Sequence, residues 1–248
     1  MPHISIKAET LFTVFGFPVT NSYVASLVGI GLFLLVGVYY SAQVRKTEKS
    51  SLFYVIHICV KALYDLFGQI VGANNDYFFP LLGGFFIYIL IQNWFGLIPG
   101  VGSVMVQVQE HGILASIPLL RGSDADLNGT LALAIISVFF IQYFGIQFLG
   151  FFGYVSKFIN IKGPIEFFIG FLDIISEISK IISFAFRLFG NIFAGEVLMT
   201  IVAFLVPVLA SFPFLLLELF VGVIQALVFA MLTAVFIQIA IQKHHETA

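Results

Sequence analysis

Long apolar runs, separated by short polar or charged segments, follow one another along most of the chain. A helix needs roughly 20 mostly apolar residues to cross a bilayer. Five runs reach or approach that length, so we predict five membrane-crossing helices. The last two exceed one perpendicular crossing, and we expect them to form a long tilted hairpin. The predicted helices cover about residues 23–40, 78–99, 130–154, 165–206 and 212–241, and residues 100–129 form a loop outside the membrane.

Residues 50–72 are long enough to cross a membrane but have a different pattern. His57, Lys61, Asp65 and Gln69 recur every four residues, which places them in one narrow polar stripe on a helix. This pattern favours an amphipathic helix that lies in the membrane interface with its stripe in water. A sixth crossing, with the stripe buried against neighbouring helices, is the alternative.

Composition indicates that lipid, rather than water, surrounds most of the chain. Of the 248 residues, 60% are apolar and 10% are charged, whereas soluble domains carry about 25% charged residues. This excludes a soluble enzyme, a nucleic-acid-binding protein and a disordered chain. The expected fold is an all-α polytopic membrane protein that forms one domain over residues 1–248.

The sequence gives no pattern for a cofactor, a metal or a nucleotide. Cys59 is the only cysteine, and the adjacent pair His244 and His245 defines no metal geometry. Neither of the common Gly-rich phosphate-binding patterns is present. We therefore expect no metal, no bound nucleotide and no catalytic residue in this chain.

The basic residues predict how the chain is oriented, because positive side chains collect on the cytoplasmic side of a membrane. With five crossings, seven of the eleven basic residues fall on one side and two on the other, and two more lie inside an apolar run. We expect the N-terminus outside and the C-terminus in the cytoplasm. The seven are Arg45, Lys46, Lys49, Lys61, Lys157, Lys162 and Lys243, and the two are Lys7 and Arg121.

Six ionisable residues lie within the predicted hairpin. A charge at bilayer depth costs about 3 kcal/mol and usually marks an ion pathway. The first three can reach an interface by extending their side chains, but the last three are deeper. Buried ion pairs with a purely structural role are the alternative. The six are Asp173, Glu177, Lys180, Arg187, Glu196 and Glu218.

Helical geometry separates the two central charges. Glu196 follows Arg187 by nine residues, which is two and a half turns and about 13 Å, so the two point to opposite faces and cannot pair. Asn191 stays on the side of Arg187, while Glu218 and Gln225 are seven residues apart and share a face. A guanidinium stays charged in the membrane, whereas a buried carboxyl can exchange protons near neutral pH. This combination suits the handling of protons.

Three short stretches resemble the conserved signatures of subunit a of F-type ATP synthases. The strongest is R-L-F-G-N-I-F-A-G-E at residues 187–196, which matches the family core R-L-F-G-N-x-x-A-G/D-E throughout. Residues 93–99, N-W-F-G-L-I-P, and residues 126–131, D-L-N-G-T-L, resemble two further family stretches. The resemblance covers about residues 20–243, and five crossings with one interfacial helix is also the layout of bacterial members.

The resemblance implies the stator of a rotary motor in a bacterial plasma membrane. Its partners are a ring of c subunits, the peripheral-stalk subunit b and the rest of the ATP synthase. Arg187 faces the ring and separates two aqueous half-channels, each open to one side of the membrane. Glu196, Glu218, Asn191 and Gln225 line or shape the outer half-channel, and Asp173 and Glu177 are candidates for the inner one.

Several points stay open at the level of sequence. Many bacterial members have a histidine where this chain has Glu218, so the relation between Glu218 and Glu196 is undefined. Glu110 and His111 are a solvated loop pair or a proton funnel, and the sequence does not distinguish H⁺ from Na⁺ as the transported ion. A transporter that acts alone would show inverted repeats, which are absent; a structural subunit would tolerate Arg187→Lys.

Overall fold

The computed structural model describes residues 8–98, 100–101, 104–110, 113–158, 163–206 and 211–242. His111, Lys7, Lys162 and Lys243 lie outside the described residues, and the orientation inferred in part from the three lysines stays a prediction. The elements are β1 (Thr10–Val14), β2 (Phe17–Thr20), α1 (Asn21–Val44), α2 (Ser51–Val71), η1 (Gly72–Asn74), α3 (Asn75–Phe95), β3 (Met105–Glu110), β4 (Ile113–Pro118), η2 (Ser123–Ala125), α4 (Leu127–Leu149), α5 (Phe151–Phe158), α6 (Pro164–Leu205) and α7 (Ser211–Ile241).

The described residues contain five helical runs that are long and apolar enough to cross a membrane, which confirms the predicted polytopic helical fold. One of these runs joins α2 and α3 across residues 51–95. Three predicted ends need correction: α1 ends at Val44 rather than 40, α3 at Phe95 rather than 99, and α4 at Leu149 rather than 154. The backbone at Gly150 has φ of +77°, which an L side chain rarely adopts, so the chain turns there into the separate helix α5.

Two small antiparallel hairpins add strand structure that the apolar pattern did not predict. β1 pairs with β2 before the first long helix. β3 pairs with β4 inside the region predicted as a loop, in a regular register from Met105 opposite Pro118 to Glu110 opposite Ile113. These strands are much shorter than the apolar helical runs. Their apolar and polar residues do not alternate regularly enough to distinguish a strand from a loop.

The polar stripe of α2 is exposed along its length, and its first residue, His57, also hydrogen-bonds the Tyr40 hydroxyl of α1 at 2.9 Å. His57, Lys61, Asp65 and Gln69 are all exposed, whereas Phe67 on the opposite side is completely buried. The apolar side of α2 lies against α3 and α7. The helix is therefore amphipathic as predicted, and its position at the membrane interface stays a prediction.

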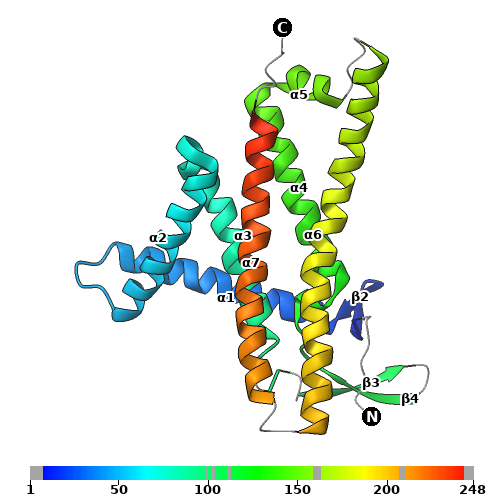
Figure 1. Ribbon diagram of the computed structural model, residues 1–248. Coiled ribbons are helices and arrows are strands. Elements are labelled where there is room, and N and C mark those ends of the chain that lie inside the picture. Colours follow the sequence, from blue (N-terminus) through cyan, green and yellow to red (C-terminus); the bar gives the residue numbers. More distant parts are fainter. Residues whose placement is uncertain are drawn as a thin grey trace.

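Figure 1 shows α6 and α7 as two long neighbouring helices, with α4 between them toward α5 and the β3–β4 hairpin near their other end. We call these the α5 end and the strand end of the hairpin. At 1.5 Å per residue, the 42 residues of α6 extend about 63 Å, twice the roughly 30 Å of a bilayer core. The helix must therefore tilt strongly. Figure 1 also shows α1 running across the direction of α7, so the two cannot both stand perpendicular to a membrane.

Small residues along α7 bring the helices close together. Gly222, Ala226, Ala230 and Ala234 recur every four residues and are buried, which lets neighbouring helices approach the α7 backbone. Ser137 of α4 and Thr233 of α7 share a buried hydrogen bond of 2.9 Å at this contact. Apolar side chains from α2, α3, α4, α5, α6 and α7 close over this stripe in one continuous core.

Candidate functional site

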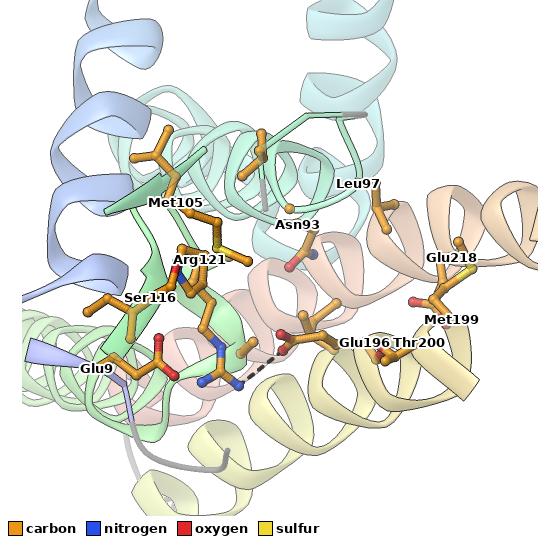
Figure 2. Close-up of a pocket in the computed structure, with 18 residues that line it drawn as sticks. Glu9, Asn93, Leu97, Met105, Ser116, Arg121, Glu196, Met199, Thr200 and Glu218 are labelled. Carbon is orange, nitrogen blue, oxygen red and sulfur yellow. Dashed lines mark hydrogen bonds and ion pairs between the residues drawn. The ribbon is translucent and has the colours of Figure 1, made fainter. Parts of the chain in front are cut away.

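A cavity of about 590 Å³ opens at the strand end, between α3, the loop before η2, α6 and α7. Four ionisable residues from four separate parts of the chain line it: Glu9, Arg121, Glu196 and Glu218. Figure 2 shows them across one view, from Glu9 on one side to Glu218 on the other. The fold therefore brings together the two carboxyls predicted for the outer half-channel, together with two charges that the sequence analysis did not assign to it.

Arg121 is the partner of Glu196. Its Nη2 lies 3.2 Å from Glu196 Oε2, and its side chain is 9% exposed while that of Glu196 is 41% exposed. Figure 2 shows the arginine reaching down from the loop to the carboxylate on α6. Glu196 therefore pairs with a basic residue of another segment and not with Arg187 on its own helix.

Glu218 is held against the backbone of α6. The residue is 8% exposed, and its carboxyl occupies the place that a Cβ on Gly195 would take. A residue with any side chain at 195 would overlap it. Glu218 therefore lies beside the residue that precedes Glu196, so the two carboxyls share one cavity although the described structure contains no hydrogen bond between them.

Two side chains at the end of α3 fix the position of α7 next to Glu218. Asn93 Nδ2 donates to the carbonyl oxygen of Gly222 at 2.9 Å, and Trp94 Nε1 donates to that of Leu219 at 3.1 Å. Gly222 also leaves room for the side chains of Asn93 and Trp94, which a Cβ would approach closely. The N-W-F-G-L-I-P stretch thus anchors the helix that carries Glu218.

A second polar cluster lies toward the α5 end. Lys180 Nζ donates to Glu177 Oε1 at 2.6 Å, and Gln142 Nε2 of α4 donates to Glu177 Oε2 at 2.8 Å. The Tyr154 hydroxyl of α5 donates to Gln142 Oε1 at 2.6 Å. The Lys180 ammonium also lies over the Phe236 ring, 4.6 Å from its centre. The Glu177 carboxylate is therefore bonded by side chains of α6 and α4, and α5 supports it indirectly through Gln142.

Arg187 lies between the two polar regions along α6. It is ten residues from Glu177 and nine from Glu196, which are about 15 Å and 13 Å along the helix. Its Nη2 donates to Ser183 Oγ at 3.4 Å, and its Nη1 is buried with no hydrogen-bond partner among the described residues. Among the described residues, the Arg187 guanidinium therefore has no charged partner.

The remaining predicted residues are not in the cavity. Asn191 is exposed on α6, Gln225 is half-buried on α7, and neither lines the cavity. Asp173 is half-buried one turn before Glu177 and has no hydrogen bond or ion pair in the described structure. Their assignment to the two half-channels stays a prediction.

The residues missed from the sequence lie in loops or at the chain's beginning. Glu9 lies just before β1, in a polar segment for which the sequence predicted no element. The fold holds it beside the start of α1, where its carbonyl oxygen accepts a hydrogen bond from Asn21 N at 3.0 Å. Arg121 was counted only for orientation. Asp124 is buried in η2, and its closeness to the D-x-N-x-T stretch was the one available signal.

The fold and the site define a class: a multi-pass membrane protein with ionisable side chains placed along its longest helix, as ion-translocating proteins have. The family model described as ATP synthase A chain matches residues 22–238. The chain therefore belongs to the ATP synthase subunit a family.

Curated relatives agree with this assignment. "ATP synthase subunit a, sodium ion specific" of Propionigenium modestum is 34% identical over 91% of this chain and 75% of the relative. "ATP synthase subunit a" of Moorella thermoacetica is 28% identical over 96% of this chain and 99% of the relative. "ATP synthase subunit a, chloroplastic" of Stigeoclonium helveticum is 34% identical over 67% of this chain and 62% of the relative.

This membership fixes the general role of the chain. It is a multi-pass subunit of the proton- or sodium-translocating membrane sector of a bacterial ATP synthase, and it works with the other subunits of that complex. It belongs to the translocating part rather than to the catalytic part.

Proposed function

We propose that this chain is the stator that carries protons to and from a rotating ring of c subunits through two separate half-channels. The observation that supports this most strongly is the order of groups along α6. Glu177 and its partners lie on one side of Arg187, and the cavity with Glu196 and Glu218 lies on the other. Two polar regions with a fixed cation between them are what two half-channels require.

The cavity at the strand end is the proposed outer half-channel. It contains water-sized space and three carboxyl groups, which are able to exchange protons. The ion pair with Arg121 keeps the Glu196 carboxylate in the cavity. Glu218, deeper and less exposed, is the proposed last carboxyl before the ring, and Asn191 and Gln225 shape the route beyond it.

The cluster around Glu177 is the proposed inner half-channel. Asp173 lies one turn nearer the α5 end and leads to it. The hydrogen-bonded series from Tyr154 through Gln142 to Glu177 provides polar groups across three helices that are otherwise apolar. Lys180 balances the charge of Glu177, so the cluster is neutral when no proton is in transit.

The side of α6 that carries Arg187 is suited to contact with other helices. Small residues lie on it at helical spacing, and this allows close approach of helix backbones. The Arg187 side chain is half-buried, and its one hydrogen bond in the described structure, from Nη2 to Ser183 Oγ, is long at 3.4 Å, so the guanidinium is able to bind a carboxylate from outside the chain. We infer that this partner is the carboxyl of each passing c subunit. The small residues are Ser176, Ser179, Ser183, Gly190 and Ala194.

The test is proton transport by the reconstituted ATP synthase carrying Arg187→Ala or Arg187→Lys, with exposed Arg45→Gln as the matched control. Each proton that crosses the membrane releases about 2.3 kcal/mol per 100 mV. Without the positive charge between the half-channels, protons would cross without turning the ring, and this free energy would be lost. We expect both Arg187 variants to assemble but to lose ATP-driven proton pumping, and the control to pump normally. Normal pumping by Arg187→Ala contradicts the half-channel proposal, and normal pumping by Arg187→Lys favours a purely structural charge. Repeating the measurement with and without Na⁺ identifies the ion.

A further inference from the structure

Asp124 is a buried carboxyl that the proposed transport route does not use. It lies in η2, is 1% exposed, and both of its carboxyl oxygens are buried without a hydrogen-bond partner in the described structure. A bare carboxylate in such a place is costly by several kcal/mol. Something must therefore neutralise it.

Polar side chains of α1 and α3 lie near this carboxyl, because both helices pack against η2. The hydroxyls of Ser123 and Ser26 lie 2.6 Å apart, and Gln92 Nε2 donates to the Tyr88 hydroxyl at 2.8 Å. The Tyr88 hydroxyl in turn interacts with Ser26 and, electrostatically, with Asp124. Ser123, Ser26, Tyr88 and Gln92 therefore form one hydrogen-bonded cluster, and Asp124 is close enough to Tyr88 to act on it electrostatically.

The cluster has unpaired oxygen atoms in addition to those of Asp124. Gln92 Oε1 and Ser22 Oγ are buried without a partner in the described residues, and Gln92 itself is 1% exposed. Gly29 of α1 makes room for the Gln92 amide, which a Cβ there would overlap. The Gln92 amide is therefore held in the interior by the space at Gly29, with its oxygen unpaired in the described structure, which is an arrangement suited to binding a ligand.

Among the described residues, no cation is hydrogen-bonded to Asp124. Neither α1 nor α4 contains a charged residue, and Tyr88 is the titratable group on the facing side of α3. The helix α6 also packs against η2, and its Glu196 lines the same cavity as Gly122 and Ala125. Arg121 reaches Glu196 of α6 instead, and Asp126 accepts from Asn128 at the start of α4. Burial raises the pKa of Asp124 to about 7.

We propose that Asp124, Gln92 and the neighbouring serine hydroxyls form a buried binding site for one monovalent cation, either a proton or Na⁺. One carboxylate needs one positive charge to become neutral, so a divalent ion would leave the buried site charged. The free ligand atoms are all oxygens, which hard cations prefer. The site lies behind the cavity wall formed by Gly122 and Ala125 and does not involve Arg187.

The test compares infrared difference spectra of the whole ATP synthase in lipid nanodiscs for the wild type, Asp124→Asn and the exposed-loop control Glu48→Gln. In choline chloride, we expect one protonated-carboxyl signal to disappear between about pH 6 and about pH 8, around the pKa of Asp124. The signal should be present in the control and missing from Asp124→Asn. If added Na⁺ removes it at constant pH, the site takes Na⁺; if Na⁺ has no effect, the site takes a proton.

A second variant keeps Asp124 in place. Gly29→Ala displaces the Gln92 amide, so we expect the midpoint of the signal to shift by half a pH unit or more, about threefold in affinity. The proposal is wrong if the Asp124 signal stays unchanged from about pH 5 to about pH 9 in both ionic conditions. It is also wrong if Asp124→Asn and the wild type give identical difference spectra.

Discussion

The contact between Glu218 and Gly195 makes a sharp prediction for Gly195→Ala. The added Cβ would overlap the Glu218 carboxyl, which must move by about 1 Å to reach an ordinary contact distance. The displaced group is the end of a flexible side chain, so the cost is that of a poorer rotamer, about 1 kcal/mol. We expect the complex to assemble. Because a misplacement of about 1 Å can slow a positioned reaction by up to about 100-fold, we expect proton flux to fall at least tenfold.

The assay is ATP-driven acidification of liposomes that contain the purified complex, with the amount of assembled complex measured in the same sample. Gly84→Ala is the matched control, because a Cβ at Gly84 of α3 meets no atom within 4 Å. The double variant Gly195→Ala with Glu218→Asp should recover part of the flux, since aspartate is one methylene shorter. Normal flux in Gly195→Ala refutes the reasoning, and so does a double variant no better than either single one.

Two further predictions concern the loop between β4 and α4. Arg121→Gln should reduce proton flux severalfold. Thermal midpoints of Arg121→Gln, Glu196→Gln and the double variant should give a coupling of about 0.5–1 kcal/mol, small because Glu196 is partly exposed; additive effects would contradict the pairing. For Asp124, the folded pKa of about 7 lies above the usual value of about 3.9, so its contribution to stability is full below about pH 4 and is lost as pH rises through 7, by about 4 kcal/mol in total. Asp124→Asn should flatten this part of the pH dependence of the thermal midpoint, and an unchanged curve would contradict the burial argument.

The helical framework could be predicted from sequence because lipid imposes a length and an apolar composition on every crossing helix. The long hairpin of α6 and α7 and the amphipathic pattern of α2 followed from this constraint alone. The end of α4 at Gly150 could not be predicted, because the next apolar residues continue the same hydropathy into α5. Nor could the β3–β4 hairpin, whose strands are held by backbone pairing rather than by an apolar pattern.

The candidate site was predictable only where its residues lie on apolar helices. A charge such as Glu196 or Glu218 stands out against its surroundings there, and its spacing fixes the face it occupies. Arg121 and Glu9 lie in polar segments, where a charge is ordinary, and only the folded chain brings them beside Glu196. Asp124 was missed for the same reason, since its burial depends on α1, α3, α4 and α6 packing around η2.

The two bonds from α3 to α7 have a mechanical consequence. Asn93 and Trp94 donate hydrogen bonds to the carbonyl oxygens of Gly222 and Leu219, which lie three residues apart on α7. A helix held by one hydrogen bond could still rotate about it. Two hydrogen bonds to separate carbonyls resist both translation of α7 along its axis and rotation about it. In the rotary mechanism that we propose, each step of the ring would exert a sideways force on this subunit. The two hydrogen bonds would then hold Glu218, one residue before Leu219, in place against that force.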